Sequence, residues 1–199
     1  MKHAIAIALI SLGLTGCAST SMKSVWKDPE MNGVDIKGKK VVTILASDKR
    51  AARLGAEDAV ARYLTSLGAE ATPSFQVLAP EATKEEAKAK LEGDGFDAAV
   101  VMRVTDKSQE IYSTPGMYAP AAYGGYYGRG WGYGMAYGTA PEIRTDTKIF
   151  VETMVYSLKA DKLVWAGVTE TTNPSDVDKF ATEVATIAIE AMKKSGALK

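Results

Sequence analysis

A glycine- and tyrosine-rich stretch at residues 112–141 separates two blocks of ordinary globular sequence and limits how this chain can fold. It contains seven of the nine Tyr, eight of the 18 Gly and Trp131, and its one charged residue is Arg129. Ordering a backbone costs about 1–2 kcal/mol per residue, and glycine keeps that cost high. We therefore expect one fold built from the flanking blocks, with residues 113–141 inserted between two strands of the same sheet.

The block before the insertion begins with a strand and a helix. Residues 40–46 (KVVTILA) form a β-branched apolar run that predicts a buried strand. We expect Asp48 to cap the helix that follows and Gly68 to end it in the left-handed conformation. Asp58 and Arg62 are spaced to form an i,i+4 ion pair on the exposed side of this helix.

A second strand–helix unit and a central strand complete this block. Residues 70–75 predict a weak strand near a sheet edge, because Pro73 cannot donate a ladder hydrogen bond. Thr83 and Glu86 match a capping box for a short helix that ends at Gly93. Residues 97–105 predict a central strand that continues to Tyr112 as a more exposed extension.

The block after the insertion predicts a hairpin and a long helix. Residues 145–158 alternate with a period of two, and residues 163–171 form the return strand. Asn173 is expected to cap the last helix, with Pro174 at its first position. A continuous apolar face on this helix must lie against the sheet.

Together these elements predict a single α/β (α+β) domain with the order β-α-β-α-β, insertion, β-β-α. The early strand–helix units favour parallel crossovers, whereas the late hairpin is antiparallel. We therefore expect a mixed sheet backed by three helices, at residues 25–199.

The N-terminus predicts a lipid anchor. A basic start and an apolar run at residues 4–14 precede Leu14-Thr15-Gly16-Cys17, which resembles the bacterial lipobox. Residues 1–16 would be the signal peptide, Cys17 the lipidated residue and residues 17–24 a tether. A buried Cys after an apolar helix and an ordinary secretory signal are the alternatives. Ala18, in place of Asp, favours the outer membrane, with the domain facing the periplasm.

Three short segments carry a family resemblance: VWKDP at residues 25–29, FDAAVV at 96–101 and KLVWAG at 162–167. They resemble uncharacterised bacterial envelope lipoproteins with a periplasmic domain of unknown function. The fold of such domains is similar to the N-terminal domain of the Tol translocation protein and to the curli-secretion lipoprotein. The resemblance implies a location, a fold and a part in envelope assemblies, but no catalytic signature.

The residue inventory argues against an enzyme. The single His is His3, within the predicted signal peptide, and the single Cys is Cys17. The mature chain therefore lacks the residues for a Ser-His-Asp or Cys-His arrangement, and we expect no metal and no cofactor. Twenty-four Lys and Arg balance 24 Asp and Glu, which gives no indication of nucleic-acid binding.

The insertion is the candidate binding surface. Tyrosine and tryptophan provide contact area with few rotatable bonds, and glycine permits adaptation to a partner. An envelope protein is the leading partner, a glycan the second, and the membrane interface the third; a loop without specific function is the simplest alternative. A glycan- or small-molecule-binding domain with weak catalytic activity is the alternative function. The candidate partner-binding residues are Tyr118, Tyr123, Tyr126, Tyr127, Arg129, Trp131, Tyr133 and Tyr137.

Overall fold

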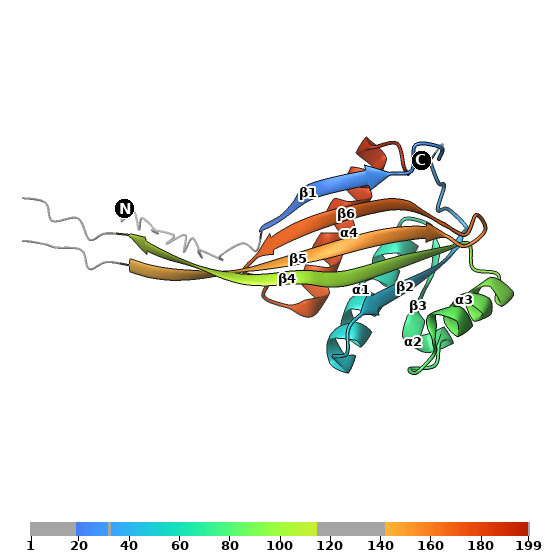
Figure 1. Cartoon of the computed structure of the whole chain (residues 1–199), viewed down its shortest axis with the longest axis horizontal. Coiled ribbons are helices and arrows are strands. Elements are labelled where there is room, and N and C mark those ends of the chain that lie inside the picture. The colour runs from blue at the N-terminus through green and yellow to red at the C-terminus, as the bar shows by residue number, and fades with distance from the viewer. Residues whose placement is uncertain (1–18, 32, 115–141, 199) are drawn as a thin grey trace, which may run out of the picture.

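The computed structural model describes residues 19–31, 33–114 and 142–198 (Figure 1). They form one six-stranded sheet with four helices. In chain order the elements are β1 Ser19–Lys27, β2 Lys40–Ala46, α1 Arg50–Ser66, β3 Glu70–Pro73, α2 Ser74–Val77, α3 Lys84–Gly93, β4 Ala98–Thr114, β5 Glu142–Ser157, β6 Lys162–Thr172 and α4 Val177–Lys194.

The sheet is mixed, with the strand order β1-β6-β5-β4-β2-β3. The first four strands in this order pair antiparallel, whereas β2 pairs parallel with both β4 and β3. Helices α1 and α4 pack on one face over the main core, and α3 packs on the other face, where Leu91 meets Val42 and Ala99. The predicted α+β class and mixed sheet are confirmed.

The structure adds two elements to the predicted order. Residues from Ser19 onward, expected as part of a tether, form strand β1 because they pair with β6 from Ser19–Thr172 to Lys27–Trp165. Residues 74–77, of which the first two were expected in a strand, form the short helix α2. Trp26 on β1 is 48% exposed, whereas Trp165 on β6 is fully buried.

Two predicted helix caps are wrong. Lys49, not Asp48, is the N-cap of α1, and no side-chain cap bond forms there among the described residues. Asp176, not Asn173, caps α4 by accepting a hydrogen bond from the Lys179 amide at 3.0 Å. Asn173 cannot serve as the cap because its side chain is bound to β5 instead.

Other local predictions are confirmed. Thr83 and Glu86 form the capping box of α3. Asp58 pairs with Arg62, and Gly68 adopts a φ of +95° after α1.

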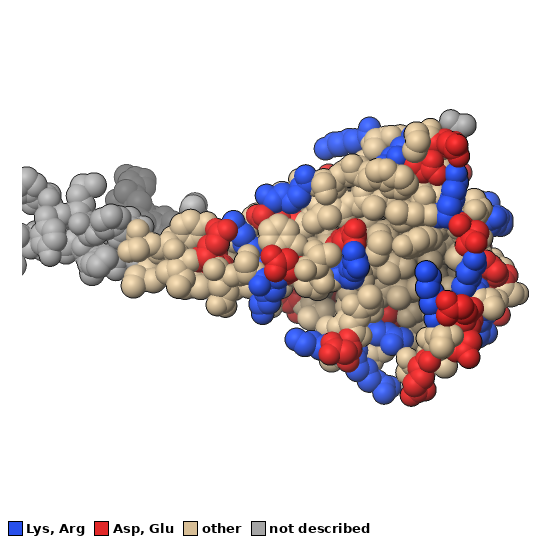
Figure 2. Space-filling view, in the orientation of Figure 1, with Lys and Arg blue, Asp and Glu red and all other residues tan. Residues whose placement is uncertain are grey.

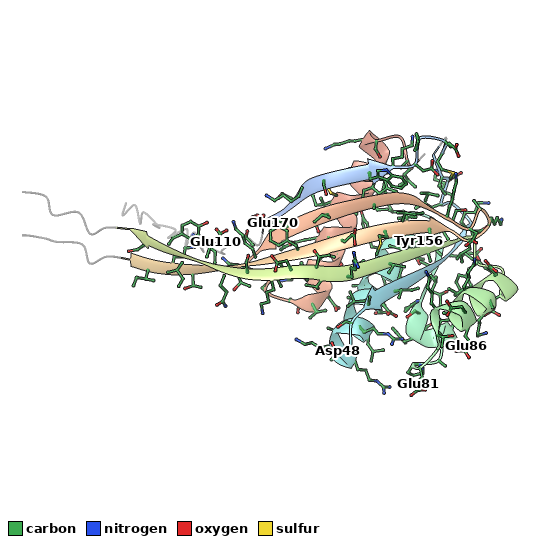
Figure 3. All side chains as sticks on the ribbon, viewed as in Figure 1. Asp48, Glu81, Glu86, Glu110, Tyr156 and Glu170 are labelled. Carbon is green, nitrogen blue, oxygen red and sulfur yellow. The ribbon has the colours of Figure 1, made fainter. Side chains whose placement is uncertain are left out.

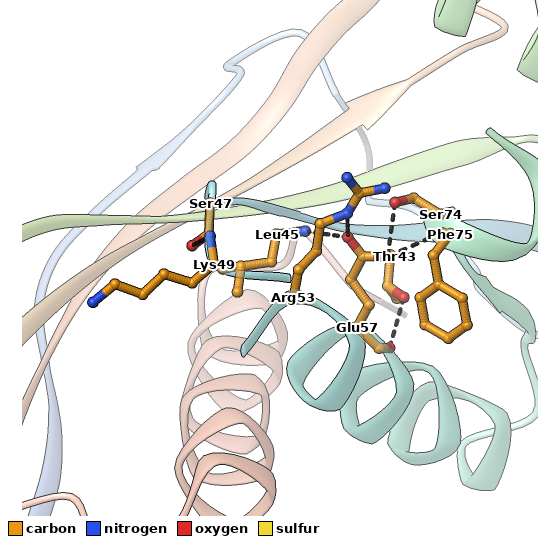
Figure 4. A network of polar contacts seen from close by, with 8 residues as sticks. All are labelled: Thr43, Leu45, Ser47, Lys49, Arg53, Glu57, Ser74 and Phe75. Carbon is orange, nitrogen blue, oxygen red and sulfur yellow. Dashed lines mark hydrogen bonds and ion pairs between the residues drawn. The ribbon is translucent and has the colours of Figure 1, made fainter. Parts of the chain in front are cut away.

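A buried carboxylate joins α1 to two other elements (Figure 4). Glu57 is fully buried, and its Oε1 accepts hydrogen bonds from the Leu45 amide at 3.0 Å and the Arg53 Nε at 3.2 Å. Its Oε2 accepts bonds from the Ser74 hydroxyl at 2.7 Å and the Phe75 amide at 3.2 Å. Since each oxygen has two donors, the charge is compensated in the interior.

We predict that Glu57→Ala destabilises the domain by about 3 kcal/mol or more, since it leaves the buried donors unpaired. Urea unfolding of the parent and the variant measures the difference. Asp58→Ala is the matched control, because it removes an exposed i,i+4 pair worth at most about 1 kcal/mol. An equal decrease in the free energy of unfolding in the two variants would contradict a structural role for Glu57.

Gly167 on β6 leaves room for the ring of Trp165. A Cβ at position 167 would lie 2.9 Å from Cζ2 and 3.2 Å from Cζ3 of that ring, which is itself fully buried. We predict that Gly167→Ala lowers the free energy of unfolding by about 1–3 kcal/mol through overpacking. Gly93→Ala is the control, because the added methyl meets nothing within 4 Å. The urea unfolding midpoint of this variant should stay close to that of the parent protein.

Candidate functional site

The β4–β5 hairpin extends beyond the rest of the sheet (Figure 1). The pairing of β2 with β4 ends at Ala46–Arg103, and the pairing of β6 with β5 ends at Thr172–Lys148. Beyond those points the two strands pair with each other as far as Thr114–Glu142. We call residues 108–114 and 142–148 the arm. The more exposed extension predicted for β4 is confirmed, and β4 continues to Thr114, two residues into the stretch assigned to the insertion.

The two faces of the arm differ in charge. Directly opposed residues share a face, and alternate residues along each strand do too. The cross-strand register therefore places Ser108, Glu110, Tyr112, Arg144, Asp146 and Lys148 on one face, which we call the charged face. It places Gln109, Ile111, Ser113, Ile143, Thr145 and Thr147 on the other, which we call the uncharged face.

Side chains on the charged face pair with one another. Lys148 Nζ lies 2.7 Å from Glu110 Oε1, and Arg144 Nε lies 2.7 Å from Asp146 Oδ1. Tyr112 donates its hydroxyl to Glu110, which Figure 3 labels on the arm. The Lys148 hydrogen bond, followed by that of Tyr112, lowers the pKa of the Glu110 carboxyl. Glu110 in turn raises the pKa of the Lys148 ammonium and of the Tyr112 phenol.

The uncharged face presents two isoleucines to solvent. Ile111 is 72% exposed and Ile143 is 70% exposed, and the register places them diagonally across the strand pair. A two-stranded ribbon is marginally stable in water, and bare strand edges favour pairing with other chains. Among the described residues, neither edge of the arm beyond its root has a strand partner. The arm therefore presents apolar side chains and open backbone groups together.

Asn173 fastens the root of the arm to the body. Its backbone amide donates to the Thr147 carbonyl at 2.8 Å, and its Oδ1 accepts from the Thr147 amide at 2.8 Å. Its Nδ2 donates to Asp146 Oδ1 at 2.8 Å, and this bond is the largest cause of the lowered pKa of Asp146. The backbone of Asn173 has a φ of +52°, a conformation that asparagine tolerates better than most residues.

A pocket of about 530 Å³ lies at the base of the arm. It is bounded by β2, β4, β5 and the first turns of α1 and α4. The strands line it with side chains from the face of the sheet that continues outward as the uncharged face of the arm. Its volume suits a small organic molecule. The wall is mainly apolar, with Leu45, Met102, Val104, Ile149, Val151, Val177 and Phe180. Its charged residues are Asp48, Lys49 and Asp176 near the helix starts and Lys107 on β4.

The residues predicted as sites from the sequence lie outside the described part of the chain. Cys17 precedes it, and the aromatic candidates Tyr118 to Tyr137, with Arg129 and Trp131, fall within residues 115–141. Sequence reasoning missed Ile111, Ile143 and the role of Asn173. The lengths of the predicted strands were a signal for the arm. The strands predicted at residues 40–46 and 163–171 are too short to pair along the full length of the two long strands that flank the insertion.

Within residues 19–31, 33–114 and 142–198, no helix is long and apolar enough to cross a membrane. No group of three or more His, Cys, Asp and Glu side chains is placed there to hold a metal ion.

Comparison with known proteins finds no matching family model and no matching curated protein. Among solved structures, the PelC dodecamer from Paraburkholderia phytofirmans has a TM-score of 0.46 and 13% identity, covering 86% of this chain and 94% of that one. A single-residue variant of that dodecamer gives a TM-score of 0.47 and 13% identity, covering 86% and 95%. Lipoprotein GNA1162 from Neisseria meningitidis has a TM-score of 0.41 and 14% identity, covering 79% and 96%. With TM-scores below 0.5, these likenesses carry no functional conclusion for this chain.

We predict that Asn173→Gly raises the pKa of Asp146 toward its ordinary value of 3.8, since glycine keeps the positive φ but lacks the side chain. Because the pKa of Asp146 is lowered in the folded protein, its ionised carboxyl stabilises the arm at pH values above the ordinary pKa. This contribution is lost as the pH falls through the lowered pKa. Stability of the arm in the variant should therefore depend less on pH in this acidic window.

Carbon-13 NMR titration of the Asp146 carboxyl measures this pKa in the parent and the variant. Asp161→Gly is the control, because Asp161 also has a positive φ, of 49°, but lies in the β5–β6 turn at the other end of the hairpin. An unchanged Asp146 titration in Asn173→Gly would show that Asn173 does not hold this carboxylate.

Proposed function

We propose that this protein is a non-catalytic interaction module of the bacterial cell envelope, and that the arm with its insertion is its binding element. In this proposal a lipid on Cys17 anchors the chain to the outer membrane, and the domain faces the periplasm. The lipobox-like sequence supports the anchor. The arm, which leaves the body with two exposed isoleucines, is the observation that carries the binding role.

The arm contributes no described residue to the hydrophobic cores of the domain. The main core is formed by α1, α4 and the sheet, and it contains no residue of the arm among those the structure describes. Open edges and exposed apolar residues promote aggregation unless they are covered. A ribbon of this kind is suited to strand addition by a partner or to contact through its side chains.

The sequence between the two strands of the arm strengthens this proposal. Residues 115–141 connect Thr114 to Glu142, so the insertion begins and ends at the described tip of the arm. Tyr118, Tyr123 and Trp131 are among the aromatic residues that the insertion would offer to a partner. An envelope protein, a glycan and the membrane are the three partner classes to distinguish.

We predict that a photo-crosslinking residue at Thr145 captures a partner in intact cells, since Thr145 is exposed on the uncharged face. The same residue at Ala160, exposed in the β5–β6 turn, is the matched control. Mass spectrometry of the captured species identifies the partner class. Equal capture from both positions, or capture from neither, would contradict a binding role for the arm.

A shortened chain tests whether the arm is separate from the core. In this variant an Asn-Gly turn replaces residues 109–147, joining Ser108 to Lys148, which are directly opposed in the ladder. The thermal unfolding midpoint should stay close to that of the parent while co-purification of envelope components is lost. Loss of the folded domain would instead make the arm part of the core.

A further inference from the structure

The lipid anchor and the arm leave the body at the same end. Ser19, the first described residue, pairs with Thr172 on β6, and Thr172 pairs with Lys148 on β5. Lys148 is at the root of the arm, so Ser19 lies two strand spacings, or about 10 Å, from that root. Figure 1 shows the start of β1 beside the point where β4 and β5 leave the sheet.

The chain between the anchor and the body is too short to hold the arm away from a membrane at that end. Cys17 precedes Ser19 by two residues, which span at most about 7 Å when fully extended. The arm advances six residues from Ser108 to Thr114, or about 20 Å at the rise of an antiparallel strand. An arm directed toward the membrane therefore outreaches the tether, and its outer part must enter or lie along the surface.

The chemistry of the arm matches this position. From Gln109 to the described tip, the uncharged face contains two isoleucines and otherwise neutral polar residues. The charged face pairs Glu110 with Lys148 and Asp146 with Arg144, as befits a side turned to water. In Figure 2 the atoms of Lys, Arg, Asp and Glu lie on the inner part of the arm, and its described tip shows none in this view.

Toward the body the same side of the sheet carries Lys107 and, beyond it, further exposed apolar side chains. Val104 is 51% exposed at the base of the arm, and Val177 is 45% exposed at the start of α4. Both line the basal pocket on the side of the uncharged face. An amphipathic element with one apolar and one charged face, close to a covalent lipid, is suited to lie in the interfacial region of a bilayer.

We propose that the arm lies against the membrane leaflet that holds the Cys17 lipid, with its uncharged face toward the acyl chains. This rests on the proposed function, because it assumes the lipid anchor and names the partner of the same arm. The acyl chains supply most of the affinity, since each buried methylene contributes about 0.8 kcal/mol. The isoleucines set the orientation of the domain, and the open strand edges lie close to the headgroups.

The test uses the full lipidated chain in vesicles of phosphatidylethanolamine and phosphatidylglycerol at a 3:1 ratio. The lipid blocks the single Cys of the chain. Each variant therefore carries one introduced Cys, to which a polarity-sensitive fluorophore is attached. The three positions are Thr145 and Ser113 on the uncharged face and Ala160 in the distant β5–β6 turn. Lipids with a spin label on the acyl chain should quench the fluorophore at Thr145→Cys and Ser113→Cys but leave Ala160→Cys unquenched.

A second variant separates the isoleucines from the anchor. Ile111→Ser with Ile143→Ser, in the Thr145→Cys background, should reduce the quenching at position 145 while the protein stays bound to the vesicles. Quenching at position 145 no greater than at 160 would overturn the membrane placement. If arm-specific crosslinks to a protein were still captured in cells, the proposed function would stand with a different partner. An intact mass without acyl chains on Cys17 would overturn both the anchor and this placement.

Discussion

The antiparallel pairing of β4 with β5 holds together both the sheet of the body and the arm. Its ladder runs from Ala98–Ser157 to Thr114–Glu142, longer than any other in the sheet. The parallel strands β2 and β3 are added on the β4 side, and β6 and β1 on the β5 side. Because those flanking strands are shorter, the same ladder that holds the centre of the body together also continues as the arm.

Hydrophobic periodicity predicted most of the strands and helices of the body. The apolar run at residues 40–46 coincides with β2, and the alternation from Thr145 places Ile149, Val151 and Val155 on the helix-covered face. Residues 19–27 were harder to assign because their sequence, STSMKSVWK, has little apolar content. They become strand β1 through pairing with β6, a long-range contact that no local pattern specifies.

The polar residues that matter most were the least predictable. Glu57 occupies an ordinary helical position, and its four donors come from parts of the chain between 12 residues earlier and 18 residues later. Asn173 stands before Pro174 in a pattern typical of a helix cap, yet its side chain binds β5 at a separation of 26 residues. Tertiary partners determine such roles, whereas capping rules consider neighbouring residues alone.

The position of β1 has a mechanical consequence. The chain enters the sheet at Ser19, two residues after Cys17, and eight register pairs join β1 to β6. Antiparallel hydrogen bonds lie perpendicular to the strands, so tension applied along β1 by a lipid at Cys17 would load the whole ladder in shear instead of opening it pair by pair. Thr20 adds a lateral connection, since its hydroxyl donates to Glu183 of α4 at 3.0 Å. The edge strand nearest the predicted lipid thus distributes any pull from the membrane across the sheet.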